Sequence, residues 1–218
     1  VVPTVVEIVD IAGLVKGASK GEGLGNKFLG NIREVDAIIH VIRCFEDENI
    51  LRDEGAINPV GDKDIIDTEL QLKDLESVEK KIQKTEKLVR VDPKLKGELD
   101  VLLRCKDQLE QGKSIRGLQL SKEEKVAIAD LFLLTEKPVL YVANVDEASM
   151  HTGNRFSKAL QEAIQHENAE MIIMNNSIEA QIAEMEELAD KQLFMEEYSM
   201  KEPALDRLIH SAYKLLNL

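Results

Sequence analysis

The sequence predicts an α/β fold in which a doubly wound parallel sheet is interrupted by an inserted helical hairpin. Short β-branched runs alternate with helical patterns towards both ends of the 218-residue chain, and this alternation is typical of a parallel sheet. Residues 64–90 between them contain neither Gly nor Pro and repeat apolar residues at helical spacing. We therefore expect residues 1–63 and 134–218 to form one α/β domain and residues 64–133 to form an inserted coiled-coil domain.

The first segment contains the patterns of strand, loop, helix and strand in that order. Residues 5–9 are a β-branched run that suits a buried strand, and a glycine-rich stretch follows as far as Gly25. Phe28, Leu29 and Ile32 recur at helical spacing, and residues 37–44 are a second apolar run. We expect two strands of the sheet here with one helix between them.

The middle of the chain predicts two long amphipathic helices and a shorter third one. Asp92-Pro93 ends the first helix, and leucines from Leu95 to Leu109 mark the second. A turn with proline between two such helices favours an antiparallel hairpin. Ser121 and Glu124 have the spacing of a capping box, which predicts a third helix as far as residue 132.

The α/β pattern resumes at Pro138. Residues 139–143 and 171–174 are apolar runs that predict strands. Helical spacing over residues 154–164, 178–188 and 205–216 predicts three helices around them. The simplest architecture is one sheet domain with a helical insertion.

Composition narrows the class of protein. The net charge of −13 disfavours general nucleic-acid affinity, and we expect no direct DNA binding. Cys44 and Cys105 lack the spacing of a zinc site, and two cysteines suggest a reducing compartment. The chain contains no apolar run of about 18 residues, so we expect no membrane partner. These features predict a cytoplasmic protein.

Asp10 and Gly13 form a DxxG motif after the first predicted strand. In P-loop hydrolases this aspartate reaches Mg²⁺, usually through water, and the glycine amide meets the γ-phosphate. Ligands also bind where strands end in open α/β sheets. The motif is common, and an ordinary turn is the alternative. The glycines from Gly17 to Gly25 favour a loop that changes shape around a phosphate, although a plain surface loop has similar residues.

Two polar loops follow the later strands. Asn144-Val145-Asp146-Glu147 stands where guanine-nucleotide hydrolases carry NKxD, whose aspartate accepts two hydrogen bonds from guanine. Here Val145 replaces the lysine and Glu147 is one methylene longer, so guanine recognition does not follow. Asn175-Asn176-Ser177 stands at the third base-contacting loop of such folds. In both cases an ordinary polar loop is the alternative.

Gly112-Lys113-Ser114 resembles the end of a phosphate-binding loop. The upstream glycine of that motif is Asp107 here, and the segment closes a predicted helix. No GxxxxGK[ST] motif occurs in the 218 residues. We therefore do not interpret this segment as a phosphate site.

Residues 9–45, VDIAGLVKGASKGEGLGNKFLGNIREVDAIIHVIRCF, resemble the switch II region and following strand of the YchF (Obg-like ATPase) family of P-loop hydrolases. The predicted hairpin is similar to that family's inserted coiled-coil domain, and NVDE is similar to its NxxE replacement of NKxD. Residues 202–218 resemble the last stretch before its C-terminal TGS domain. The resemblance covers essentially the whole chain.

This resemblance implies an ATPase that prefers ATP to GTP, uses Mg²⁺ and is associated with ribosomes and stress responses. Asp10 matches the metal position, with Mg²⁺ held through water, and Gly13 matches the γ-phosphate position. Asn144, Val145 and Glu147 match the adenine-recognition loop, to which Asn175 and Ser177 add the next loop. GTP is a second candidate nucleotide.

Leu14 occupies the position where Ras-like enzymes place a water-orienting glutamine. An apolar side chain cannot polarise water, so the resemblance implies slow intrinsic turnover. The family's first strand, phosphate loop, first helix, switch I and TGS domain have no counterpart in these residues. We therefore expect this chain alone to bind little nucleotide and to be inactive.

A non-enzymatic interaction module is the competing interpretation. The charged hairpin would then dock on a ribosome or a protein partner while the α/β part supports it. Lys80, Lys81, Lys84 and Lys87 form a candidate basic stripe, although interspersed acids also suit a solvated helix face. Nucleotide-dependent stabilisation favours the hydrolase, and partner capture by the hairpin favours the module.

Overall fold

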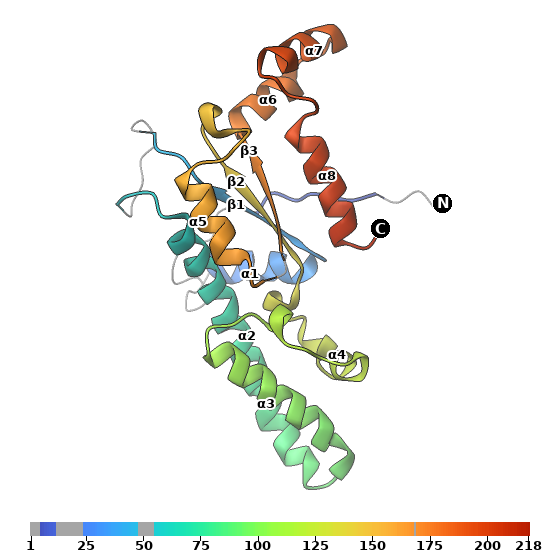
Figure 1. Ribbon diagram of the computed structural model, residues 1–218. Coiled ribbons are helices and arrows are strands. Elements are labelled where there is room, and N and C mark those ends of the chain that lie inside the picture. Colours follow the sequence, from blue (N-terminus) through green and yellow to red (C-terminus); the bar gives the residue numbers. More distant parts are fainter. Residues whose placement is uncertain (1–4, 12–23, 48–54, 168) are drawn as a thin grey trace. The chain divides into compact units, whose positions relative to one another are not determined.

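The computed structural model describes residues 5–11, 24–47, 55–167 and 169–218. The chain divides into two units (Figure 1). The α/β unit comprises Val1–Ile8, Ala37–Lys63 and Pro138–Leu218, and the helical unit comprises Val9–Asp36 and Asp64–Lys137. Residues 9–36 thus group with the helices, whereas the sequence assigns them to the α/β domain. The domain boundaries at residues 63 and 133 stay a prediction.

The described part of the α/β unit contains a sheet of three parallel strands. These are β1 (Ile38–Arg43), β2 (Val139–Asn144) and β3 (Glu170–Met174), in the order β1-β2-β3. β2 lies in the middle, and all its residues before Asn144 are buried. Such a continuous apolar run is typical of a strand that is covered on both faces. The strands predicted at residues 37–44, 139–143 and 171–174 are confirmed.

Helices cover both faces of this sheet. Tyr141 and Ala143 of β2 pack with Leu160 of α5 (Arg155–Ile164). Leu140 and Leu208 belong to a separate cluster between the other face and α8 (Ala204–Leu215). Figure 1 shows these two helices on opposite sides of the strands. The doubly wound arrangement is therefore confirmed, because alternate residues of β2 supply the core on each face.

One predicted helix is two helices in the structure. Instead of a single helix over residues 178–188, the chain forms α6 (Asn176–Glu184) and α7 (Leu188–Glu197). Met185, between them, has an extended backbone. Carboxylates are unfavourable at a helix C-terminus and favourable at an N-terminus. Glu186 and Glu187, just before α7, therefore favour a new helix N-terminus at this point.

The strand predicted at residues 5–9 is wrong. Residues 5–11 have no regular secondary structure, and Val5, Ile8 and Val9 are 89%, 56% and 55% exposed. A strand satisfies its backbone N–H and C=O groups only beside another strand. The described strands pair only with one another, in the order β1-β2-β3, so residues 5–9 gain no partner from them.

The predicted helical hairpin is confirmed. It consists of α2 (Pro59–Val89) and α3 (Lys96–Glu110). α2 starts five residues before its predicted beginning, and its residues from Asp64 onwards belong to the helical unit. The turn between them contains Asp92, whose side chain accepts a hydrogen bond from the Lys94 N–H at 3.0 Å. The shorter helices α1 (Leu24–Glu34) and α4 (Lys122–Ile128) belong to the same unit. The capping box of Ser121 is present at the start of α4.

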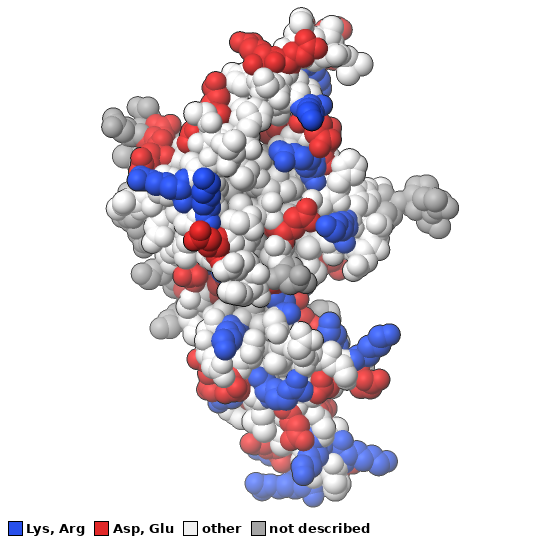
Figure 2. Space-filling model, viewed as in Figure 1, with Lys and Arg blue, Asp and Glu red and all other residues white. Residues whose placement is uncertain are grey.

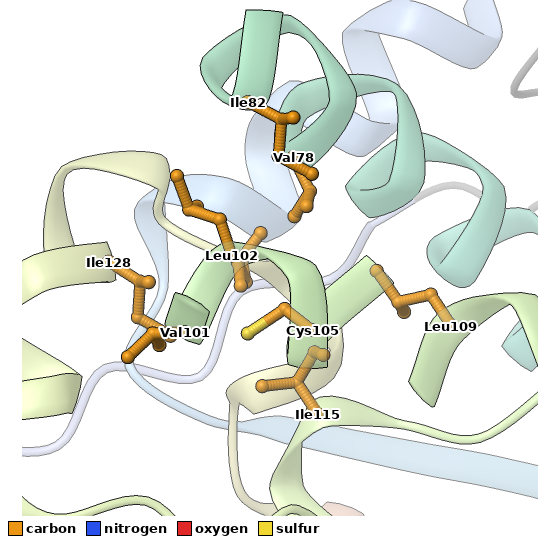
Figure 3. Close-up of a cluster of buried hydrophobic side chains, with 9 residues drawn as sticks. Val78, Ile82, Val101, Leu102, Cys105, Leu109, Ile115 and Ile128 are labelled. Carbon is orange, nitrogen blue, oxygen red and sulfur yellow. The ribbon is translucent and has the colours of Figure 1, made fainter. Parts of the chain in front are cut away.

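The hairpin has its own apolar core (Figure 3). Side chains of α2 and α3 meet there with those of the segment that follows α3, and most are less than 5% exposed. The cluster consists of Val78, Ile82, Val101, Leu102, Cys105, Leu109, Ile115, Ile128 and Leu133.

The buried carboxylate of Asp74, on α2, holds the segment that follows α4. Asp74 accepts hydrogen bonds from the Leu134 N–H (2.8 Å), the Thr135 N–H (2.8 Å) and the Thr135 hydroxyl (2.7 Å). Burial raises the pKa of Asp74, and these three hydrogen bonds oppose that rise. These hydrogen bonds hold residues 134–135 against α2, about 60 positions earlier in the chain, within the helical unit.

Candidate functional site

The loops after β2 and β3 are tied together at the carboxyl edge of the sheet. The Asn144 side-chain oxygen accepts a hydrogen bond from the Asn176 N–H at 3.1 Å. In return, the Asn175 side-chain amide donates to the Val145 carbonyl at 2.8 Å, and the Val145 N–H donates to the Met174 carbonyl at 2.9 Å. The structure therefore brings together the two loops that the sequence singles out as candidate base-contacting loops.

Asn154 connects a third strand end to the same edge. Its amide nitrogen donates to the Cys44 carbonyl after β1 at 2.7 Å and to the Asp146 carboxylate at 3.3 Å. Its side-chain oxygen caps α5 by accepting from the N–H groups of Phe156 and Ser157, both at 3.0 Å. One side chain thus joins the loop after β1, the NVDE loop and the start of α5.

Asn154 is not among the site residues predicted from the sequence. The local signal is an asparagine after Gly153, three residues before Ser157, because that spacing fits a helix N-cap with a reciprocal bond. The Ser157 hydroxyl does accept from the Asn154 N–H at 2.9 Å. The contact with Cys44 is different, since it joins residues 110 positions apart and has no local signature.

The two carboxylates of NVDE have different roles. Asp146 accepts from the Ser149 N–H at 3.0 Å and faces Asn154, so its oxygens stabilise the loop itself. Glu147 is exposed, and its carboxylate has no hydrogen bond or ion pair among the residues that the structure describes. Glu147 therefore provides a carboxylate acceptor at this edge that is available to a ligand.

The other predicted nucleotide contacts lie beside it. Val145 is 1% exposed, and both its backbone N–H and its carbonyl are hydrogen-bonded within the protein. Ser177 is exposed in the first turn of α6, whose N-cap is Asn175. Asn144 keeps its amide nitrogen for a ligand because only its side-chain oxygen is used by Asn176. Among the described residues, this edge thus offers the Asn144 amide as a donor and the Glu147 carboxylate as an acceptor.

Of the DxxG residues, the structure describes Asp10, which belongs to the helical unit. Asp10 is exposed in a segment without regular secondary structure. Gly13 and Leu14 lie outside the described residues. The assigned roles of these three residues stay predictions.

Other candidate chemistry is limited in the part of the chain that the structure describes. No group of three or more potential metal ligands occurs there, and no helix there has the length and apolarity needed to span a membrane. Gly112, with a φ of +69°, ends α3 as expected for a helix C-terminus.

Burial, with a smaller effect of Asp62, raises the pKa of the Cys44 thiol to about 12. Cys44 is consequently a poor nucleophile at neutral pH.

A hollow of about 450 Å³ lies elsewhere on the α/β unit. It follows β3 and α8, and its lining includes His151, Arg207 and His210. None of the residues that tie the strand ends together lines it. We therefore place the candidate site at the strand ends and not in this hollow.

Comparison with known proteins gives a consistent result. A model of the "50S ribosome-binding GTPase" family matches residues 3–89. The "Ribosome-binding ATPase YchF" of Escherichia coli O157:H7 is 47% identical over 217 residues, which cover 99% of this chain and 59% of that relative. The protein of the same name from Bacillus subtilis (strain 168) is 46% identical over 220 residues and is covered over 60% of its length. Over nearly its whole length, this chain is therefore similar to YchF proteins.

A solved YchF structure supports the same conclusion. The structure of the Schizosaccharomyces pombe YchF GTPase superposes with a TM-score of 0.81 at 33% identity, covering 95% of this chain and 57% of that one. The α/β P-loop hydrolase fold and the resemblance to YchF are therefore confirmed. This chain spans about three fifths of the length of the curated YchF relatives that it matches.

Proposed function

We propose that this chain carries the base-recognition part of a YchF-type nucleotide hydrolase that prefers ATP to GTP. The observation that supports it is the tie between Asn144 and the loop of Asn175, beside which Glu147 stays exposed. A rigid strand edge with few convergent polar groups is typical of a ligand site in an α/β sheet.

The Asn144 amide and the Glu147 carboxylate suit a purine base. Because the Asn144 oxygen is held by Asn176, its amide nitrogen has a set direction and suits the N7 acceptor, which adenine and guanine share. Glu147 only accepts hydrogen bonds and suits the exocyclic amine of adenine. Guanine hydrolases use a shorter aspartate at this position and a lysine where Val145 is buried here. A guanine would thus lack the hydrogen bonds on which its recognition depends.

The phosphate chemistry is assigned to the DxxG segment. Mg²⁺ keeps several waters and takes one or two carboxylates together with substrate phosphates, so the single exposed carboxylate of Asp10 suits it. Bound Mg²⁺ would neutralise charge on those phosphates. Gly13 would donate its amide to the γ-phosphate. Leu14 cannot orient the attacking water through a hydrogen bond, so intrinsic turnover is slow.

The biological assignment follows the relatives. Both YchF relatives are named ribosome-binding ATPases, and the matching family is described as ribosome-binding. We extend this to a ribosome partner for the present protein, in the cytoplasm, with a role in stress responses. ATP is the preferred nucleotide, and GTP is the weaker alternative.

Calorimetric titration tests this function. ATP and GTP, each with Mg²⁺, are titrated into the 218-residue chain and into the protein expressed from the complete gene. We expect ATP to bind more tightly than GTP to the complete-gene protein and neither to bind tightly to the 218-residue chain. Equal affinities, or tighter binding of GTP, would contradict the proposed preference. Tight binding to the 218-residue chain would instead refute our expectation that this chain alone binds little nucleotide.

A further inference from the structure

The hollow on the α/β unit has the size of a small-molecule site. It is lined by residues of β3 and α8 and by residues shortly after the NVDE loop, all of which belong to the α/β unit. Its volume of about 450 Å³ lies within the roughly 300–1,000 Å³ that is common for ligand pockets. Figure 1 shows α8 running beside β3, and Figure 2 shows side chains of both charges over the region of α8.

The outer edge of β3 supplies backbone donors to the hollow. Residues 170–173 of β3 line it, and in the described sheet β3 has β2 as its neighbour on the other side. The Met174 carbonyl accepts from the loop after β2, whereas the Ile173 carbonyl accepts from Arg207 at 3.3 Å. Because successive residues of a strand direct their backbone groups to opposite sides, the N–H groups of Met171 and Ile173 face away from β2.

Arg207 presents a guanidinium group to the same hollow. The side chain is exposed, and its hydrogen bond to the Ile173 carbonyl fixes its direction while other N–H groups remain for a ligand. Arg207 makes no ion pair within the described residues. His210 also lines the hollow, three residues later on the same helix. An oriented guanidinium suits a carboxylate, which accepts two parallel hydrogen bonds from it.

The two carboxylates that line the hollow differ in their surroundings. Glu170 is compensated, because the Ser211 hydroxyl donates to it at 3.0 Å and Lys214 forms an ion pair with it at 3.3 Å. Glu202 is exposed and makes no hydrogen bond or ion pair in the part of the chain that the structure describes. The hollow therefore presents the carboxylate of Glu202 and the guanidinium of Arg207, which are not paired with each other.

We propose that the hollow binds a small zwitterion of the α-amino-acid class. The carboxylate of the ligand lies at Arg207 and the outward N–H groups of β3, and its ammonium group lies at Glu202. A simple anion would meet the like charge of Glu202, and a simple cation would meet that of Arg207. The side chain of the ligand rests against Met150, since a flexible thioether adapts to different shapes. This site shares no residue with the base-recognition edge, so the inference is independent of the proposed preference for ATP.

The histidines report on binding at this place. The 218-residue chain contains four of them, of which His151 and His210 line the hollow and His40 and His166 do not. NMR follows their imidazole C–H signals, and replacing each histidine by Gln assigns its signal. The probes are phenylalanine, leucine and glycine, which share the zwitterion and differ in side chain. We expect saturable shifts of the His151 and His210 signals, with the other two unchanged.

Four single variants test the two charges. Arg207→Gln and Glu202→Gln remove them from the hollow, and Arg90→Gln and Glu162→Gln remove the same charges from exposed positions outside it. We expect each variant in the hollow to raise the Kd of phenylalanine about tenfold or more, because it removes a charge-assisted hydrogen bond. The two controls should leave the Kd unchanged. Circular dichroism shows that all four variants are folded.

Two modified ligands assign each contact. N-acetylphenylalanine keeps the carboxylate and lacks the ammonium group, so its binding should be sensitive to Arg207→Gln and insensitive to Glu202→Gln. Phenylalanine amide keeps the ammonium group and lacks the carboxylate, so the opposite sensitivities are expected. The reverse of this pattern would overturn the proposed orientation, and phenylacetate binding as tightly as phenylalanine would overturn the zwitterion in favour of a simple anion site.

The remaining outcomes are equally decisive. Absence of saturable binding of all three amino acids at millimolar concentration would overturn the proposal, as would an unchanged Kd in either Arg207→Gln or Glu202→Gln. Calorimetry repeats the titration on the protein expressed from the complete gene, with its nucleotide site saturated by ADP and Mg²⁺. Equal affinity there would support the site. Absence of binding there would show that another part of that protein covers the hollow, and would overturn the proposal.

Discussion

Replacing Asn154 tests whether one side chain holds the strand ends together. Asn154→Ala removes the cap of α5, which contributes about 1 kcal/mol. It also removes the hydrogen bonds to the Cys44 carbonyl and the Asp146 carboxylate, each contributing about 0.5–1.5 kcal/mol. We therefore expect a loss of about 2–4 kcal/mol in the free energy of unfolding of the α/β unit. Asn154→Ser keeps a good capping residue but cannot reach Cys44, so it should recover about 1 kcal/mol of this loss.

The tyrosines make the assay specific for this unit. The chain contains no Trp, and its three tyrosines, Tyr141, Tyr198 and Tyr213, all lie in the α/β unit. Urea unfolding followed by tyrosine fluorescence therefore reports on that unit, and circular dichroism at 222 nm reports on the helices of both. With an unchanged m-value, the shift in midpoint gives the change in stability.

The outcome also separates the cap from the clamp. A loss below about 0.5 kcal/mol for Asn154→Ala would refute the reasoning, since a cap alone contributes more than that. If Asn154→Ser matched wild type, the bond to Cys44 would contribute nothing and the three strand ends would not be held by Asn154. If the serine variant fell between the other two proteins, both roles would be supported.

Three further predictions concern buried polar and nucleophilic groups. Asp74→Ala should destabilise the helical unit by about 2–5 kcal/mol in a thermal melt at 222 nm, because it leaves two buried N–H groups unsatisfied; the exposed control Asp100→Ala should change little. Burial raises the pKa values of the Cys44 and Cys105 thiols to about 12 and about 11. Because the reactive thiolate forms only as the pH rises towards those values, both thiols should react with iodoacetamide at pH 8 at least a hundredfold faster in urea than in the folded protein. Equal rates would show that the thiols are accessible in the folded protein. Glu179→Gln should lower the free energy of unfolding, measured by tyrosine fluorescence, by about 1–2 kcal/mol, because the buried Glu179 carboxylate accepts hydrogen bonds from two N–H groups at the start of α8. An unchanged midpoint of urea unfolding would contradict this role of Glu179.

Much of the fold is readable from local patterns. β2 is apolar at every position before Asn144, and Ser121 with Glu124 marks the start of α4 through a local capping box. Such features depend on neighbours in the sequence and are predicted correctly. Residues 5–9 show the limit of this approach, because their β-branched side chains favour an extended backbone but a strand also needs an adjacent partner. The break between α6 and α7 was missed because apolar residues continue at near-helical spacing across it.

The candidate site shows the same division. Asn144 and Asn175 were predictable as neighbours, because the carboxyl ends of adjacent parallel strands meet at one edge. The hydrogen bonds from Asn154 to Cys44 and from Thr135 to Asp74 were not predictable, since each joins residues far apart in the sequence. Neither partner has a distinctive pattern of its own. Only the folded chain shows that Asp146 stabilises the loop while Glu147 stays exposed.

The proposed preference for ATP depends most on Glu147 as the acceptor that selects the base. The direct measurement is calorimetric affinity for ATP and for GTP, with Mg²⁺, in the complete-gene protein carrying Glu147→Ala, with Glu162→Ala on α5 as the exposed control. We predict that Glu147→Ala lowers the ratio of ATP to GTP affinity at least tenfold, or about 1.4 kcal/mol, mainly through weaker ATP binding, while the control keeps the wild-type ratio. An unchanged ratio in Glu147→Ala, with wild type preferring ATP, would contradict the assignment of the base to the edge formed by the loops after β2 and β3.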